Sequence, residues 1–139
     1  MFDPQVTVEM LNMKFKKNML EHLDIEFIEV GPDFIKARMP VDHRTKQPMG
    51  ILHGGASVTL AETLGSAAAS CLIDPEKQYC VGLDINSNHI KSMTEGYVIG
   101  VTKPIHIGKK TQVWEIRIEN EDGQLINISR ITMAVIDKK

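Results

Sequence analysis

Hydrophobic positions recur along the chain at two different spacings. Between residues 6 and 23 they return every three or four positions, the period of a helix with one buried face, at Val8, Leu11, Phe15, Met19 and Leu23. This pattern predicts an amphipathic N-terminal helix over about residues 6–23. Lys14, Lys16 and Lys17 lie on its other face, which we interpret as a solvated basic surface.

After residue 23 the pattern changes to segments typical of β-strands. Asp24–Val30 and Phe34–Met39 flank a Gly-Pro-Asp turn signal and predict a hairpin. Four longer segments follow further on: Tyr79–Lys91, Gly96–Ile107, Thr111–Asn120 and Gln124–Ile136. Turn residues separate them, so we expect consecutive segments to pair antiparallel. Pro104 predicts an edge position or a bulge within its strand.

The stretch Ile51–Ile73 has neither pattern, because it is small or apolar on nearly every side. A helix without a polar face is normally buried, so we predict a buried central helix over about residues 54–72. The stretch is too polar for a membrane span. Glu62 is its only formally charged residue. Burying a carboxylate is costly unless it is paired, so Glu62 is the first candidate for chemistry.

The order of elements predicts an α+β fold in one domain over residues 1–139. We expect the central helix to lie against the concave face of one curved antiparallel sheet. The net charge of −2, with acids and bases interspersed, argues against nucleic acid or a membrane as a partner.

Two features favour a cytoplasmic protein. The N-terminal residues lack the basic and apolar regions of a signal peptide. The two cysteines, Cys71 and Cys80, make no disulfide framework, and we expect both to be reduced. No HExxH, paired CxxC, P-loop or GxGxxG occurs, so we expect no metal and no cofactor.

A His-Gly-Gly sequence, His53-Gly54-Gly55, opens the predicted central helix. The first N–H groups of a helix lack intrahelical partners and attract negative charge. Gly54 could therefore present an oxyanion hole, or the glycines could merely allow tight packing. Eight residues later, Glu62 could be a nucleophile or general base, or a buried side chain bonded to Ser66.

Two further sets of residues have both a functional and a structural interpretation. His89 shares the strand parity of Val81, Leu83 and Ile85, so unless a bulge intervenes it faces the central helix, as a core or a pocket residue. Lys109 and Lys110 follow Gly108 in a turn and either bind phosphates or are solvated.

Several motifs resemble those of one enzyme family. Residues 47–55 read QPMGILHGG and residues 61–66 read AETLGS, which is similar to the signature of hotdog-fold acyl-CoA thioesterases. Residues 81–89, VGLDINSNH, and residues 112–114, QVW, resemble the branch containing bacterial 1,4-dihydroxy-2-naphthoyl-CoA and aroyl-CoA thioesterases. The resemblance runs from about Asp42 to the C-terminus.

The resemblance implies a hotdog fold, in which a curved antiparallel sheet wraps a long central helix. It also implies a homodimer with one continuous sheet, often paired again into a homotetramer. Glu62 would be the catalytic carboxylate, attacking the thioester carbonyl or activating water. The Gly54 N–H would polarise that carbonyl, and Gln47 and His53 would orient the thioester.

Other positions would form the rest of the substrate site. Ser66 and His89 would line the acyl or water side of the pocket. Lys91 stands where relatives often carry Arg, which keeps the charge but loses the planar fork. Lys91, Lys109 and Lys110 are our candidates for binding the CoA nucleotide.

We therefore predict an enzyme that hydrolyses an aromatic or other acyl-CoA, such as 1,4-dihydroxy-2-naphthoyl-CoA, to the free acid and CoA. The alternatives are a hotdog-fold hydratase and a non-catalytic acyl-CoA sensor. A helix rises about 1.5 Å per residue, so Gly54 and Glu62 are roughly 12 Å apart on one helix. Because both must reach one carbonyl, we expect two chains of a dimer to share each site.

Overall fold

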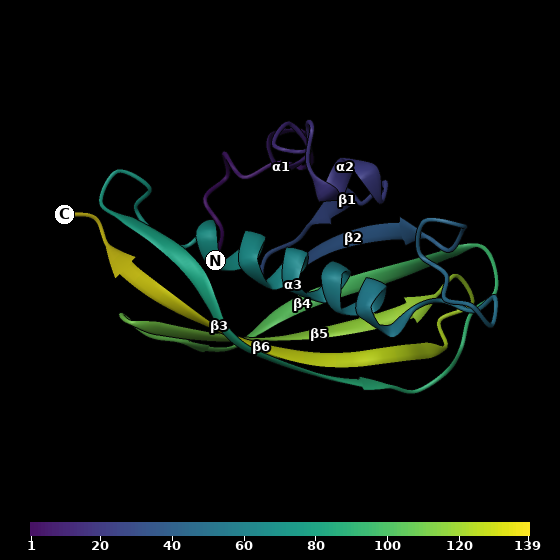
Figure 1. The fold of residues 1–139 in the computed structure, drawn as a ribbon. Helices are drawn as coiled ribbons and strands as arrows, with labels where there is room; N and C mark the ends of the chain where they lie inside the picture. Colours follow the sequence, from purple (N-terminus) through teal and green to yellow (C-terminus); the bar gives the residue numbers. More distant parts are fainter.

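In the computed structural model, which describes residues 1–139, a single six-stranded antiparallel sheet forms most of the molecule (Figure 1). Its strands lie in the order β1-β2-β4-β5-β6-β3. Their bounds are β1 Glu26–Val30, β2 Ile35–Pro40, β3 Gln78–His89, β4 Tyr97–Ile107, β5 Thr111–Asn120 and β6 Leu125–Asp137.

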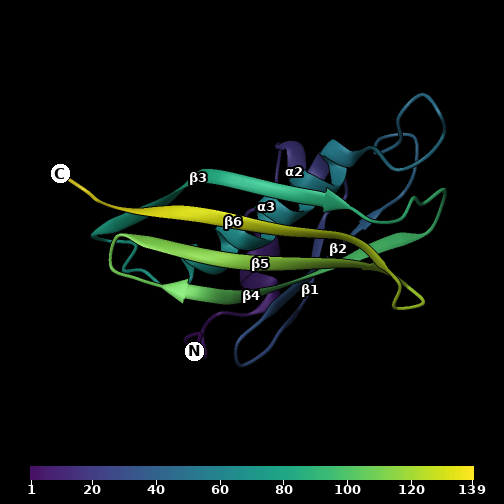
Figure 2. The same cartoon turned by 90° about the horizontal axis from the view of Figure 1, so that it is seen from below.

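The long helix α3, Gly54–Ser70, lies along the concave face of this sheet (Figures 1 and 2). Its sheet-facing side chains are fully buried and include Leu60, Leu64 and Ala68. Small residues allow the close approach: a Cβ on Gly65 would come within 2.4 Å of Ile131. The predicted α+β arrangement, a central helix wrapped by a curved antiparallel sheet, is thus confirmed.

The single N-terminal helix predicted over residues 6–23 is wrong. The chain forms two short helices instead, α1 Val8–Asn12 and α2 Met19–His22. Between them Lys17 has a positive φ of 56°, which no α-helix tolerates. The Asn18 side chain then accepts hydrogen bonds from the N–H groups of Leu20 and Glu21, so it caps a new helix rather than continuing the old one.

The expected strand pairing is right for three hairpins and wrong for one. The pairs β1–β2, β4–β5 and β5–β6 are antiparallel neighbours along the chain. However, β3 pairs with β6, and β4 pairs with β2, so the segment after β3 crosses to the other side of the sheet. Gly96, with φ 81°, marks a turn there, but a turn residue does not determine which strand edge is free to pair.

Pro104 lies where β4 departs from regular pairing. The register shifts between Pro104 and His106, and β2 pairs with β4 only as far as Thr102. The missing N–H of Pro104 therefore removes no ladder bond on the β2 side, as predicted for a bulge or an edge. None of the helices is long and apolar enough to cross a membrane.

Candidate active site

The N-terminus of α3 is capped by a histidine. The His53 Nδ1 accepts a hydrogen bond of 2.8 Å from the Gly55 N–H, and the His53 carbonyl accepts bonds from the N–H groups of Ala56 and Ser57. The Gly54 N–H alone in this first turn has no partner in the chain. A single backbone donor at the positive end of the helix is thus left available to an acceptor from outside.

The loop between β2 and α3 positions Gln47 and His53. Its buried Thr45 donates through Oγ1 to the Pro40 carbonyl at 2.9 Å, and the Thr45 carbonyl accepts the His53 N–H at 2.8 Å. The Gln47 N–H in turn bonds the Ile51 carbonyl at 2.9 Å. These bonds fix the loop backbone and thereby the position of His53 at the start of α3.

A carboxylate–guanidinium pair braces the same loop. Arg44 Nη2 donates to Asp42 Oδ2 at 2.6 Å, and Arg44 Nη1 reaches the carbonyl of His22 in α2 at 3.2 Å. The side-chain hydrogen bond from Arg44 is the main reason that the pKa of Asp42 is lowered from 3.8 to about 2.

A polar network within the sheet holds the His89 side chain. The fully buried Asn127 donates from Nδ2 to Ser87 Oγ at 2.7 Å and to His89 Nδ1 at 3.1 Å. Its Oδ1 accepts from Ser129 Oγ at 2.7 Å. Because Nδ1 accepts, the neutral imidazole carries its proton on Nε2. Nε2 faces the start of α3, since a Cβ on Gly54 would lie 2.7 Å from it.

His89 therefore faces the helix as predicted, but Val81 and Leu83 do not share its face. The register of β3 shifts between Gly82 and Asp84, and this bulge reverses the alternation. Val81 and Leu83 are consequently exposed, while Gly82 points at α3. A bulge is not visible in a hydrophobic pattern, which is why parity predicted only part of this strand.

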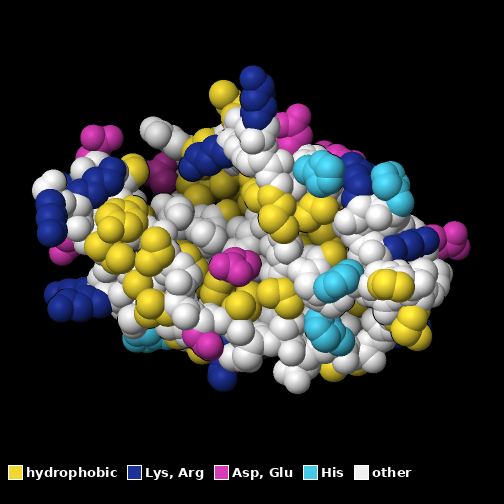
Figure 3. Space-filling model, viewed as in Figure 1, with side chains coloured by type: hydrophobic (Ala, Val, Ile, Leu, Met, Phe, Trp, Pro, Cys, Tyr) yellow, Lys and Arg dark blue, Asp and Glu magenta, His cyan; other side chains and the backbone are white.

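Glu62 is exposed in the single chain, so its predicted burial is wrong here. The sheet covers one side of α3, and Glu62 lies on the other, open side. On the face of the molecule viewed as in Figure 1, acidic side chains stand among apolar and small ones (Figure 3). Its carboxylate has no hydrogen-bond or ion-pair partner in the chain, so the alternative interpretation, a Glu62 side chain bonded to Ser66, does not describe the single chain. A Cβ on Gly82 would lie 3.1 Å from Glu62 Oε1, so the carboxylate extends over β3 at a position without a side chain.

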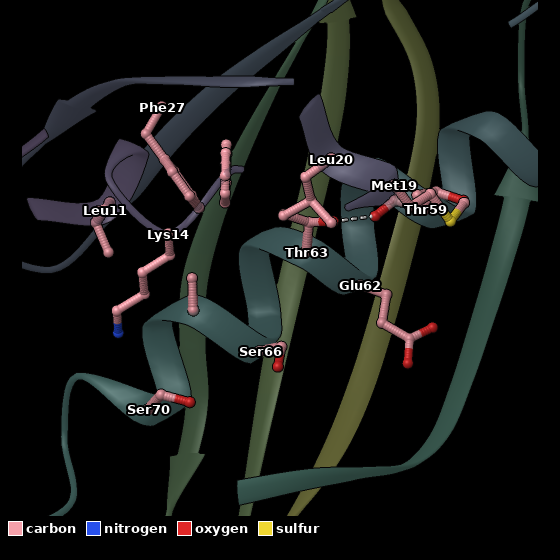
Figure 4. Close-up of a pocket in the computed structure, with 12 residues that line it drawn as sticks. Leu11, Lys14, Met19, Leu20, Phe27, Thr59, Glu62, Thr63, Ser66 and Ser70 are labelled. Atoms are coloured by element: carbon pink, nitrogen blue, oxygen red, sulfur yellow. Dashed lines mark hydrogen bonds between the residues drawn. The ribbon is translucent and has the colours of Figure 1, made fainter. Parts of the chain in front are cut away.

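The candidate residues fall into separate groups within one chain. Gln47, Gly54, His89 and Lys91 line a cavity of about 270 Å³ at the start of α3, and His53 lies beside it in a shallower hollow. Glu62 and Ser66 line another cavity, of about 490 Å³, further along the helix (Figure 4).

The three candidate lysines are also divided. Lys91 Nζ donates to Gln124 Oε1 at 2.8 Å near the N-terminal end of α3. Lys109 and Lys110 occupy the β4–β5 turn beside Leu72, just past the C-terminal end of α3. One chain therefore does not bring the three cations together.

Asn127, Ser87 and Ser129 are residues that sequence reasoning missed. Asn127 and Ser129 have no motif around them, and Ser87 lies within the 81–89 motif, from which only His89 was assigned a role. The one available signal was that Asn127 and Ser129 have the same parity in β6, so a polar pair interrupts an otherwise apolar face.

Burial raises the pKa of the two free thiols, Cys71 and Cys80.

Comparison with known proteins assigns the chain to a family. Residues 49–127 match the model described as the Thioesterase superfamily. The chain belongs to the thioesterase superfamily. It is a hotdog-fold thioester hydrolase, so the predicted fold and activity class are confirmed.

Similar proteins cover almost the whole chain. The 1,4-dihydroxy-2-naphthoyl-CoA hydrolase of Escherichia coli is 51% identical over 132 residues, 95% of this chain and 96% of that protein. The proofreading thioesterase EntH of Cronobacter turicensis is 45% identical over 131 residues, 94% of this chain and 95% of that protein. A solved variant of thioesterase PA1618 from Pseudomonas aeruginosa has a TM-score of 0.96 at 42% identity and covers 99% of both chains.

Proposed function

We propose that this thioesterase hydrolyses the thioester of an aromatic acyl-CoA, with 1,4-dihydroxy-2-naphthoyl-CoA among its candidate substrates. The observation that carries the proposal is the coexistence of a free N–H at Gly54 and an unpaired carboxylate at Glu62. The first is suited to an oxyanion and the second to a nucleophile or general base. The relative from Escherichia coli, whose name gives this substrate, supports the choice of acyl group.

The proposed chemistry uses Glu62 in one of two ways. Either its carboxylate attacks the thioester carbon, or it takes a proton from a water that attacks. The carbonyl oxygen becomes an oxyanion that accepts the Gly54 N–H bond, and Gln47 and His53 hold the thioester in place. In the water route, collapse of the tetrahedral species breaks the C–S bond, the proton taken by Glu62 passes to the sulfur, and the free acid and CoA thiol are released. In the nucleophile route the same collapse leaves an acyl anhydride on Glu62 and a CoA thiolate that is protonated by solvent, and water then hydrolyses the anhydride to the free acid and the Glu62 carboxylate. Ser66 and His89 line the acyl or water side, and Lys91, Lys109 and Lys110 bind the nucleotide.

We also propose a cytoplasmic homodimer that pairs again into a tetramer, with each active site shared between two chains. Gly54 and Glu62 are about 12 Å apart along α3, too far for one carbonyl. An antiparallel α3 from a second chain would bring Glu62 opposite the His53 end of the first. The edge strand β3, with Tyr79 and Leu83 exposed, supports a contact that continues the sheet.

Release of free thiol from benzoyl-CoA and 2-naphthoyl-CoA tests the proposed activity. A thioesterase releases CoA-SH with either substrate, and the rate should follow protein concentration. A hydratase or a non-catalytic acyl-CoA sensor would release none. Thiol release from aliphatic acyl-CoAs at equal or higher kcat/KM would contradict the aromatic preference while leaving the activity class intact.

A further inference from the structure

The cavity beside Glu62 is bounded by two walls of different chemistry (Figure 4). The side that belongs to α3 is polar and includes Glu62, Ser66 and Ser70. The opposite side belongs to the N-terminal segment and β1 and, apart from Lys14, is apolar, with Leu20 and Phe27 among its residues. Its volume of about 490 Å³ lies within the range of small-molecule sites.

The polar side chains of the cavity form a line along α3 that runs from Glu62 to Ser70. Glu62, Ser66 and Ser70 follow one another at intervals of four residues, so they lie on one face of α3. Eight residues of helix separate the first from the last, a distance of about 12 Å. An acyl group whose carbonyl is at Glu62 would therefore extend past Ser66 toward Ser70.

The far end of this line carries a cation. Lys14 is the only charged lining residue besides Glu62, and Figure 4 shows its ammonium near the Ser70 end of α3, with Glu62 at the other end. This ammonium has no hydrogen-bond or ion-pair partner in the chain. Burial raises the pKa of the Cys71 thiol, and the positive charge of Lys14 opposes that shift, which agrees with a cation at the C-terminal end of α3.

The backbone that carries Lys14 is fixed from several sides. Asn12 forms two hydrogen bonds with the Phe27 backbone, donating from Nδ2 to the carbonyl at 2.9 Å and accepting at Oδ1 from the N–H at 2.8 Å. The Phe15 ring packs on the Phe27 ring with centroids 5.1 Å apart. The Lys14 carbonyl accepts from Asn18 Nδ2 at 3.0 Å. The break between α1 and α2 thus holds one lysine at the cavity.

We propose that Lys14 is a specificity determinant that selects acyl groups bearing an anionic substituent, such as a carboxylate, at the end remote from the thioester. This inference rests on the proposed function, because it takes the acyl group to lie in the cavity beside Glu62. An uncharged ring fits the apolar wall without using Lys14. A remote carboxylate gains a charge-assisted hydrogen bond from Lys14, with Ser70 as a second donor.

A matched pair of substrates tests this assignment: 2-naphthoyl-CoA and 6-carboxy-2-naphthoyl-CoA, which differ by one remote carboxylate. The measurement is the ratio of their kcat/KM values in the wild type, Lys14→Met, Lys14→Arg and Lys16→Met. Lys16 is the control, because it lies in the same segment and is exposed but does not line the cavity. We expect Lys14→Met to lower the ratio by about 3- to 10-fold, since the ion pair is only partly shielded from solvent.

The control variants separate a local contact from a general charge effect. Lys14→Arg should retain most of the preference and Lys16→Met all of it, and Lys16→Met should leave hydrolysis of 2-naphthoyl-CoA unchanged. An unchanged ratio in Lys14→Met, or an equal fall in Lys16→Met, would overturn the inference and leave the proposed function standing. A wild type that hydrolyses neither substrate would overturn the proposed function and this inference with it.

Discussion

At the scale of single residues, the site depends on two groups that are left without partners. The Gly54 N–H and the Glu62 carboxylate are both polar, and neither is satisfied within the chain. Neighbouring positions keep them available: His53 occupies the next N–H of the turn, and Gly82 leaves space for the carboxylate. Because neither group is occupied by another part of the chain, both are free to contact a substrate.

The role of Glu62 is tested by Glu62→Gln, which keeps the size and removes the reactive oxygen. We expect kcat for an aroyl-CoA to fall by at least about 10²-fold, the lower end for an acid–base group. KM and thermal stability should change little, because Glu62 makes no hydrogen bond within the chain. Near-normal turnover by this variant would end the assignment of Glu62 as the catalytic carboxylate.

The tautomer of His89 is tested by Asn127→Asp. A carboxylate at this position accepts rather than donates, so the His89 Nδ1 must carry a proton, in either the neutral or the charged ring. We expect the ¹⁵N resonance of Nδ1 to move from the acceptor to the protonated range, together with a loss of activity.

Ser87→Ala is the matched control for the His89 network, because it removes another partner of Asn127 but not the bond to the ring. Its Nδ1 resonance should stay where it is in the wild type. An Nδ1 that is already protonated in the wild type would contradict the hydrogen bond that Asn127 Nδ2 donates to His89 Nδ1.

At the scale of elements, α3 and the loop before it are held in place by different interactions. α3 is held by burial of one face against the sheet, and that face includes Leu60 and Leu64. The loop is held by polar contacts around Asp42 and Thr45, and these set the position of Gln47. The helix should therefore respond to cavity-forming substitutions, and the loop to pH.

Leu64→Ala tests the packing of α3. Leu64 is fully buried, and its Cδ1 occupies the space that a side chain on Gly100 would need, 2.5 Å from the Cβ position. Removing three carbons there should lower the free energy of unfolding by about 2–5 kcal/mol. Chemical denaturation measures this loss, and Met13→Ala, at a side chain that is 74% exposed, should change it by less than about 0.5 kcal/mol.

The Asp42–Arg44 pair predicts a pH dependence of stability. The folded-state pKa of Asp42 is lowered from 3.8 to about 2, so the folded protein favours the ionised form. Its contribution is complete above about pH 4 and is lost as the pH falls through 2. Asp42→Asn should therefore lower Tm at pH 7 and reduce the fall in Tm between pH 4 and pH 2. Asp33→Asn, in the exposed β1–β2 turn, should keep the wild-type profile.

At the scale of the whole molecule, the site is divided along one helix. One chain presents the Gly54 group and the Glu62 group in separate cavities, and the candidate lysines at opposite ends of the sheet. In a two-fold dimer with antiparallel α3 helices, the Gly54 group of each chain would lie opposite the Glu62 group of the other. Because a two-fold interface repeats every contact, such a dimer would contain two complete sites. Complementation between two defective variants can therefore test the proposed shared site.

Chain exchange between Glu62→Ala and His53→Ala homodimers tests the shared site. Each homodimer should be severely impaired. In a mixed dimer one site carries both defects, while the other takes Glu62 and His53 from intact copies. Random pairing makes half the dimers mixed, each with one working site of two, so about a quarter of wild-type activity should return. No recovery after verified exchange would contradict a shared site and favour one within a single chain.

The sequence alone determined the elements and most of the candidate residues. The period of apolar positions and the turn residues predicted β1, β2 and the four long strands to within two residues at each end. The lack of a polar face in the stretch Ile51–Ile73 predicted α3, which begins at Gly54, and the motifs around Gly54 and Glu62 identified the family. These features are readable because they act over a few residues: a turn, a cap and a periodic face are each formed by near neighbours.

Only the tertiary structure decided what depends on residues far apart in the chain. The pairing of β3 with β6 depends on which sheet edge is free after β4 has paired with β2, and the turn residues next to β3 do not determine that pairing. The N-terminal helix breaks because Asn12 bonds to Phe27, fifteen residues away, and Asn18 begins a new helix. The bulge in β3 and the Asn127 contact with His89 likewise join positions that are close only after the sheet has formed, so no short pattern could predict them.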